Sequence, residues 1–165
     1  MVEVTLGGKR AAVLCLLVNK DKVLLLERAK EPHLGKYIPV GGKIEPFESP
    51  QDAAKREIFE ETNVKVDNLK FCGVMVETSP IKFNWINFIY VSEVEYFEPP
   101  ECNEGTLSWK QFDSILDLPT PTTDWYIYKF IRENKSFMFN ALYDKDLNLL
   151  KLENEISNEI LFKIN

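Results

Sequence analysis

Residues 42–64 read G-K-I-E-P-F-E-S-P-Q-D-A-A-K-R-E-I-F-E-E-T-N-V. Ser49 is a favourable N-cap, and Pro50 suits the first helical position because it lacks an N–H that would need a partner there. Asn63 is, after glycine, the residue that most readily takes the left-handed conformation that ends a helix. The sequence therefore predicts a helix over Ser49–Glu61 that stops at Asn63.

Three glutamates follow one another on this predicted helix. Glu57, Glu60 and Glu61 have the i, i+3, i+4 spacing that makes side chains neighbours on one helix face. Like charges at this spacing destabilise a helix by about 0.2–0.5 kcal/mol per pair. A divalent cation would reverse the sign, because Mg²⁺ takes oxygen ligands and shares its shell with substrate phosphates. The pattern indicates either a metal site or a solvated acidic surface.

A wider spacing favours the metal site. Six positions share it, with the aliphatic Ile58 and Val64 in register: Gly42, Glu48, Arg56, Glu57, Glu60 and Glu61. General composition gives such a match a chance on the order of 10⁻⁵ over the whole chain. The segment resembles the Nudix box, G-x5-E-x7-R-E-U-x-E-E-x-G-U, where U is a bulky aliphatic residue. Asn63 replaces the last glycine, and residues 35–42 (G-K-Y-I-P-V-G-G) resemble the approach to the box.

The resemblance to the Nudix family, of the MutT type, implies an activity and a metal. Nudix enzymes hydrolyse a nucleoside diphosphate linked to another group, with Mg²⁺ or Mn²⁺. Glu57, Glu60 and Glu61 match the metal-binding and catalytic glutamates, and the backbone carbonyl of Gly41 is a further expected ligand. The expected partner is a nucleotide or another diphosphate small molecule. Dimers are common in the family, so the resemblance also allows a homodimer.

Further positions match supporting residues of the family. Arg56 and Glu48 correspond to residues that orient the glutamates through a salt bridge. The general base stays open between Glu57 and a loop glutamate. Glu104 begins the segment E-G-T-L-S-W and resembles the position where MutT-type members place another metal-binding glutamate. The alternative for Glu104 is an exposed loop acid.

The substrate is read less directly from the sequence. Phe83 and Trp109 are candidates for stacking on a base, with core packing as the alternative. Asp124 lies in residues 119–125, P-T-P-T-T-D-W, where MutT-type enzymes that clear oxidised purine nucleotides carry a Trp/Asp-bearing loop. Its carboxylate would accept hydrogen bonds from a guanine edge, but we favour its interpretation as a helix N-cap. Ile38 stands where several such enzymes carry an asparagine that binds the base.

These observations lead to one principal functional hypothesis and its alternatives. The first is a metal-dependent hydrolase of an oxidised nucleoside triphosphate such as 8-oxo-dGTP, which releases monophosphate and pyrophosphate. The alternatives are hydrolysis of an ADP-sugar, a dinucleoside polyphosphate or another diphosphate, and a nucleotide-sensing domain without turnover. The box keeps every acidic residue, which favours an enzyme.

Composition excludes several other classes of protein. The 165 residues include 26 acidic and 20 basic side chains, a net charge of −6, without a run rich in lysine and arginine. Stable binding to polymeric DNA or RNA is therefore not expected. The longest apolar run, Ala11–Val18, is far too short for a membrane span. We expect a cytoplasmic protein without a membrane partner.

The expected fold class is α/β of the mixed α+β type, as a Nudix-type α/β/α sandwich with a mixed central sheet in a single domain over residues 1–165. Helices are expected at Asp124–Glu133 and, as a short segment with Ile156 and Ile160 inward, in the last dozen residues. Strands are expected at Arg10–Val18, Val23–Leu26, Leu69–Glu77, Asn84–Val94, Thr106–Phe112, Phe137–Tyr143 and Leu147–Leu152, and Tyr37–Val40 is a short apolar segment that runs into Gly41-Gly42.

Overall fold

Strands dominate the computed structural model, which describes residues 5–165; residues 1–4 of the expected domain lie outside the described residues. The elements are β1 (Arg10–Asn19), β2 (Lys22–Arg28), β3 (Tyr37–Ile38), β4 (Val40–Lys43), α1 (Pro50–Thr62), β5 (Lys70–Thr78), β6 (Trp85–Glu93), β7 (Gly105–Gln111), the 3₁₀ helix η1 (Phe112–Asp117), α2 (Thr122–Arg132), β8 (Phe137–Tyr143), β9 (Leu149–Asn154) and β10 (Glu159–Lys163). All the strands predicted from the sequence are present, with small shifts of their ends.

The sheet is mixed, as expected. Its strand order is β10-β9-β8-β5-β6-β1-β2-β3, with β4 also paired to β1 and β7 to β2. The pairs β1–β6 and β5–β8 are parallel, and the other pairs are antiparallel. In this arrangement Leu14 of β1 is paired with Gly41 of β4 on one side and with Ile89 of β6 on the other.

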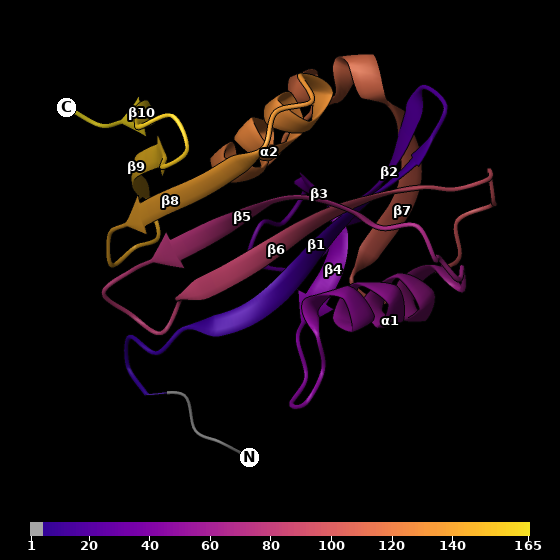
Figure 1. The fold of residues 1–165 in the computed structure, drawn as a ribbon, viewed down its shortest axis with the longest axis horizontal. Helices are drawn as coiled ribbons and strands as arrows, with labels where there is room; N and C mark the ends of the chain where they lie inside the picture. Colours follow the sequence, from indigo (N-terminus) through magenta and orange to yellow (C-terminus); the bar gives the residue numbers. More distant parts are fainter. Residues whose placement is uncertain (1–4) are drawn as a thin grey trace.

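The two α-helices cover opposite faces of the sheet (Figure 1). Because side chains alternate along a strand, β1 contributes to both cores. Val13, Cys15 and Leu17 join the core with Ile58 of α1, whereas Leu16 joins the core under α2. The α/β/α sandwich is therefore confirmed. Neither helix has the length and apolar character that a membrane crossing would need.

Helix α1 begins and ends where its sequence predicts. The Ser49 hydroxyl accepts a hydrogen bond from the backbone N–H of Asp52 at 3.1 Å. Asn63 has a φ of 60°, and its N–H donates to Phe59 O at 2.8 Å. Asparagine therefore takes the helix-ending conformation that the Nudix box assigns to glycine.

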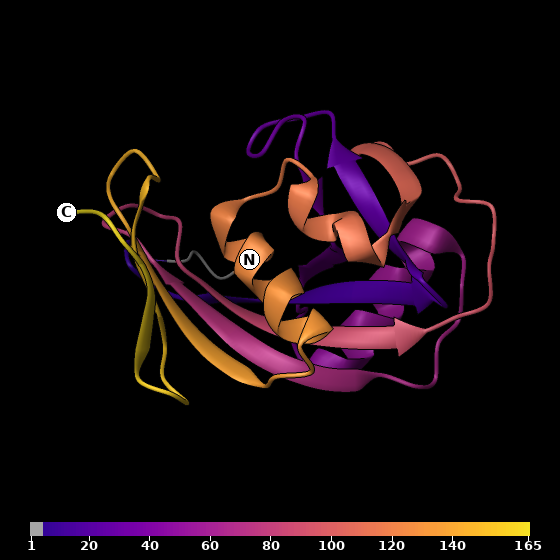
Figure 2. The same ribbon diagram turned by 90° about the horizontal axis from the view of Figure 1, so that it is seen from above.

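The predicted C-terminal helix is wrong, because the chain there forms the β9–β10 hairpin. Ile156 and Ile160 are 61% and 52% exposed instead of inward. Asn154 is buried, and its Oδ1 accepts from the N–H groups of Met138 and Ile156 at 3.1 and 3.3 Å, which stabilises a turn. Figure 2 shows this hairpin beside β8, at the end of the sheet away from α1.

Candidate active site

Arg56 organises the acidic side chains at the start of the Nudix box helix. Its Nε and Nη2 donate to Glu48 Oε1 and Oε2 at 2.7 and 2.9 Å. Nη1 donates to Glu57 Oε1 at 2.8 Å and to Glu60 Oε2 at 3.3 Å, and Nη2 also reaches Lys43 O at 2.9 Å. The hydrogen bonds from Arg56 lower the pKa of Glu48. A single guanidinium thus ties three carboxylates to strand β4.

Glu61 differs from its neighbours because its carboxylate is largely buried. Oε1 accepts a hydrogen bond from Gly41 N–H at 3.3 Å, while Oε2 is buried and has no hydrogen-bond partner within residues 5–165. Burial, together with the charges of Glu57, Glu104 and Glu60, raises the pKa of Glu61 to about 8. A buried carboxylate oxygen without a partner, among further carboxylates, fits a hard cation such as Mg²⁺ or Mn²⁺.

Gly41 and Gly42 allow strand β4 to pack closely against its neighbours. A Cβ atom on Gly42 would lie 2.4 Å from Glu57 Oε1, so a side chain there would displace the glutamate. A Cβ atom on Gly41 would lie 2.0 Å from the backbone oxygen of Val13. The Gly-Gly pair therefore brings β4 against both the α1 glutamates and strand β1.

Glu104 lies at the edge of the acidic cluster, in the segment before β7. Its Oε2 is 3.2 Å from Arg28 Nη1, and its side chain is 60% exposed. Its charge is one of those that raise the pKa of Glu61. Over the described part of the chain, no three acidic, histidine or cysteine side chains are already grouped for a metal. Glu57 and Glu60 instead point to Arg56.

Asp124 does not cap α2, so the favoured interpretation from the sequence is wrong. The helix begins earlier, because Trp125 N–H already donates to Pro121 O at 3.0 Å. Asp124 is the third residue of the helix and is only 6% exposed. Burial, followed by the charge of Glu77, raises its pKa to about 8. Asp124 is therefore an internal carboxyl of α2 and not its cap.

The two aromatic candidates lie in different surroundings. Phe83 packs edge-to-face against Tyr143, with ring centroids 5.8 Å apart. The charge of Asp124 acts on that same tyrosine. Trp109 packs against Phe97 at 5.3 Å and donates from Nε1 to the Phe97 carbonyl at 2.9 Å, in the core on the α1 side. The structure therefore brings Phe83, but not Trp109, close to the surroundings of Asp124.

Sequence reasoning missed a buried acid on β5. Glu77 Oε1 accepts from the Tyr143 hydroxyl, and Oε2 accepts from Asn87 Nδ2, both at 2.9 Å. The available signal was the two-residue period of β5, in which Glu77 shares the inward face with Met75. Beside this network is a pocket of about 250 Å³ whose polar lining includes His33, Lys36, Thr122, Thr123, Tyr143 and Asn148.

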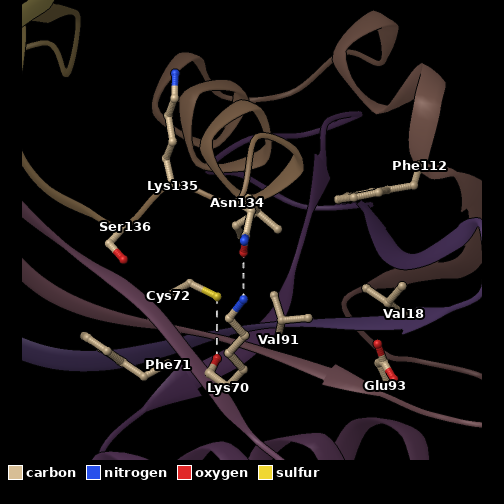
Figure 3. Close-up of a pocket in the computed structure, with 11 residues that line it drawn as sticks. Val18, Lys70, Phe71, Cys72, Val91, Glu93, Phe112, Asn134, Lys135 and Ser136 are labelled. Atoms are coloured by element: carbon tan, nitrogen blue, oxygen red, sulfur yellow. Dashed lines mark hydrogen bonds between the residues drawn. The ribbon is translucent and has the colours of Figure 1, made fainter.

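Another cavity, of about 240 Å³, lies at the C-terminal end of α2 (Figure 3). Val18, Val91 and Phe112 contribute apolar walls, and Lys70 Nζ donates to Asn134 Oδ1 at 2.8 Å between the sheet and the helix end. Its walls come from the C-terminal ends of β1 and β6 and the start of β5. The α1 glutamates are not among its lining residues, so this cavity is separate from the acidic cluster.

Comparison with known proteins agrees with this geometry. The chain matches the NUDIX domain family over residues 8–133. The Nudix hydrolase YvcI of Bacillus subtilis (strain 168) is 30% identical over 142 residues, covering 82% of this chain and 88% of YvcI. The oxidized purine nucleoside triphosphate hydrolase of Mus musculus is 27% identical over 139 residues, covering 80% and 85%.

A solved structure supports the same assignment. The MutT protein from Bacillus halodurans superposes with a TM-score of 0.79 and 29% sequence identity, covering 89% of this chain and 98% of that one. The match to the family extends over far more than half of the chain, and it contains the Arg56 network and the buried Glu61. The chain therefore belongs to the Nudix family, as a hydrolase of the MutT type that acts on phosphoric anhydride bonds.

Proposed function

We propose that this hydrolase is metal-dependent and cleaves an oxidised nucleoside triphosphate, with 8-oxo-dGTP as the first candidate, to the monophosphate and pyrophosphate. The proposed catalytic unit is a single domain over residues 1–165. The observation that carries the metal dependence is the buried Glu61 carboxylate, whose Oε2 has no partner within residues 5–165 and whose pKa is raised by burial and by the charges of three further glutamates.

The residues proposed to hold Mg²⁺ or Mn²⁺ are Glu57, Glu60, Glu61, Glu104 and the backbone carbonyl of Gly41. When bound, a divalent cation polarises phosphoryl oxygens, lowers the pKa of a bound water and offsets charge on the leaving pyrophosphate. All of these donors are oxygen atoms, which suits both cations. Glu57 and Glu60 would exchange contacts with Arg56 for contacts with the cation.

The chain's own groups would orient the reactants and accept a proton. The oxygen of a water forms a bond to phosphorus, the bridging bond between the α- and β-phosphates breaks, and pyrophosphate leaves. The proton of the water passes to a carboxylate, for which Glu57 and Glu104 are the two candidates. Arg56 and Glu48 are positioning residues in this scheme, because they hold the glutamates without contacting the substrate.

The choice of substrate is supported by one relative and one buried acid. The mouse relative is named for hydrolysis of oxidised purine nucleoside triphosphates. It is 27% identical to this chain over an alignment that covers 80% of it. Asp124 would read the base, with Phe83, which packs on Tyr143, as the aromatic candidate on that side, and Trp109, in the core on the α1 side, as a separate candidate. At the position of Ile38 the asparagine of several sanitising enzymes is missing, so Asp124 would carry more of the recognition.

The proposed partners and location follow from charge and family. A nucleotide or other diphosphate is the ligand, and the net charge of −6 opposes binding of polymeric nucleic acid. We further propose a cytoplasmic protein that works without a membrane partner, and a homodimer as its assembly.

The decisive experiment is analysis of the products by ion-exchange chromatography. The wild type and Glu61→Gln would each meet 8-oxo-dGTP, other triphosphates, ADP-ribose, diadenosine polyphosphates and a prenyl diphosphate with Mg²⁺. Monophosphate and pyrophosphate from 8-oxo-dGTP by the wild type alone would support the proposal. Faster turnover of another member of the panel would replace the substrate, and full activity of Glu61→Gln would contradict the metal assignment. No turnover, with tight nucleotide binding, would favour a sensor.

A further inference from the structure

A buried hydrogen-bond chain joins three neighbouring strands beside α2. Asn87 of β6 donates from Nδ2 to Glu77 Oε2, and Tyr143 at the end of β8 donates from its hydroxyl to Glu77 Oε1. Glu77 and Asn87 are both buried, and Tyr143 is half-buried. Each oxygen of the Glu77 carboxylate therefore has a fixed donor, and the three side chains form one continuous unit.

The direction of these hydrogen bonds determines what Tyr143 offers to a ligand. A carboxylate only accepts, so the hydroxyl proton of Tyr143 must point at Glu77. Burial, followed by the charge of Glu77, raises the pKa of Tyr143, which keeps the hydroxyl protonated. The phenolic oxygen then has only lone pairs left, toward one of which the Thr123 hydroxyl of the same pocket is directed, and it can accept a hydrogen bond but cannot donate one.

Tyr143 also forms part of the wall of the 250 Å³ pocket next to Asp124. The pocket lies between the loop that carries His33 and Lys36, the N-terminal end of α2 and the β8–β9 turn. The same loop continues through β3 to Gly41, which contacts Glu61. A substrate that extends from the acidic cluster along this loop would bring its nucleoside part to Tyr143.

A purely structural role does not explain the acid at this position. Burial raises the pKa of Glu77, and the hydrogen bonds from Tyr143 and Asn87, with the charge of Lys9, act against that rise in favour of the accepting carboxylate. Lys9 Nζ contacts the backbone oxygen of Glu77 at 2.6 Å, so the hydrogen bonds to the carboxylate itself come from two neutral groups. Replacing a whole buried ionic cluster by well-packed apolar residues of similar volume is often neutral or stabilising. The hydrogen-bond polarity that Glu77 imposes on Tyr143 gives a reason for keeping it.

We propose that Glu77 is a positioning residue that fixes the Tyr143 hydroxyl oxygen as a hydrogen-bond acceptor for an N–H or O–H donor on the nucleoside part of the substrate. This inference rests on the proposed function as a nucleotide hydrolase. The donor belongs either to the base, as a ring N–H or amino group, or to the sugar, as a hydroxyl. An acceptor fixed in this way favours such a donor and disfavours a ligand that presents a lone pair.

The test compares two nearly isosteric variants. Glu77→Gln can accept from Asn87 through its oxygen and donate through its amide to Tyr143, which turns the hydroxyl proton toward the pocket. Tyr143→Phe removes the acceptor altogether. For dGTP with Mg²⁺ we expect both variants to raise KM about tenfold while kcat changes less than twofold. Unchanged circular dichroism and melting temperature would show that both variants fold.

Three substrate analogues identify the donor. Relative to dGTP, dITP lacks the 2-amino group, 1-methyl-dGTP lacks the ring N–H, and GTP gains the 2′-hydroxyl. The effect of Glu77→Gln on KM should disappear for the base analogue that lacks the donor. An effect that persists with both base analogues assigns the donor to the sugar hydroxyl of dGTP, and a larger effect with GTP would add the 2′-hydroxyl as a second donor. Unchanged KM in both variants, or a fall in kcat with KM unchanged, would overturn the inference.

A matched control exists outside the pocket. Glu98 Oε2 accepts from the Tyr96 hydroxyl at 3.0 Å in a similar but exposed pair, so Glu98→Gln should leave every KM unchanged. Calorimetric binding of the same nucleotides gives the comparison without turnover. If the wild type binds but does not hydrolyse them, Glu77-dependent affinity would keep this inference while the hydrolase proposal fails. Equal affinities in the wild type and both variants would overturn this inference and leave the hydrolase proposal standing.

Discussion

Arg56 and Glu48 form a two-point ion pair, with Nε to Oε1 at 2.7 Å and Nη2 to Oε2 at 2.9 Å. The seven residues between them include the helix N-cap, so the pair joins the loop before α1 to its second turn. The same guanidinium reaches Glu57 and the Lys43 carbonyl. The guanidinium of Arg56 is held by Glu48 and by the Lys43 carbonyl. Its plane therefore determines the direction of the Glu57 side chain, a proposed catalytic residue.

Replacing Arg56 by lysine keeps the positive charge but loses the planar guanidinium that makes two hydrogen bonds to Glu48. We expect kcat to fall about 10- to 100-fold, the range seen when supports of metal ligands are removed. The melting temperature should change little, because the pair is only partly buried. Steady-state kinetics against the wild type measures the effect. A kcat within twofold of wild type would show that the position of Glu57 does not depend on the guanidinium of Arg56.

Alanine at the two adjacent glycines should produce opposite defects. In Gly42→Ala the new methyl group meets the flexible end of Glu57, so we expect a folded protein with strongly reduced turnover. In Gly41→Ala it meets the Val13 backbone, which cannot move away, so we expect a loss of about 1–3 kcal/mol in unfolding free energy. Urea unfolding and activity, measured on both, distinguish the two. Equal stability of the variants would contradict this assignment.

Asn63 offers a test of the altered Nudix box. Its φ of 60° lies in the left-handed region, where glycine pays no steric penalty. Asn63→Gly should therefore keep or slightly raise the unfolding free energy, whereas Asn63→Ala should lower it by about 1 kcal/mol. Activity should be unchanged in the glycine variant. A destabilised glycine variant would mean that the asparagine side chain has another role.

Asp124 should give stability a characteristic pH dependence. Its pKa is about 8 in the folded state and near 4 when unfolded, so the folded state holds a proton that the unfolded chain releases. This carboxyl makes folding less favourable as pH rises from about 4 to about 8. Asp124→Asn lacks this effect, so its stability advantage should grow by at most about 1.4 kcal/mol per pH unit. Urea unfolding between pH 4 and 9 measures it, and a flat difference would contradict burial of the acid.

Metal removal should affect the wild type and Glu61→Gln differently. A cation that binds only the folded state raises the melting temperature. After chelation, adding Mg²⁺ or Mn²⁺ should therefore raise the melting temperature of the wild type, and by more for the cation that binds more tightly. The variant lacks the carboxylate whose Oε2 has no hydrogen-bond partner over residues 5–165. It should respond weakly. Equal shifts in both proteins would place the cation elsewhere.

Local signals explain how much of this structure was predictable. Helix α1 was predicted with its cap and its end because Ser49, Pro50 and Asn63 act on their own backbone neighbours. The arrangement of Arg56 with Glu48 and Glu57 follows from one helix and the adjoining loop. Such features depend on residues close in sequence, and a spacing pattern describes them well.

Features that depend on distant residues were missed. Ile156 and Ile160 have helical spacing, but Asn154 bonds to Met138 on the neighbouring strand and turns the chain into a hairpin. Glu77 acquires its role only when β8 brings Tyr143 beside β5. The local sequence pattern predicts neither contact, because each is created by strand pairing across the sheet.

Strand β1 is paired on both edges: β6 follows it along one edge over residues 10–18, and β4 and β2 share the other. Its amide protons can therefore exchange with solvent only when the whole sheet opens. Gly41, which contacts Glu61, is paired to this strand through Leu14. The Gly41 backbone proposed to hold the cation is thus attached to the strand that should open last, and heat should inactivate the enzyme only as the sheet around β1 melts.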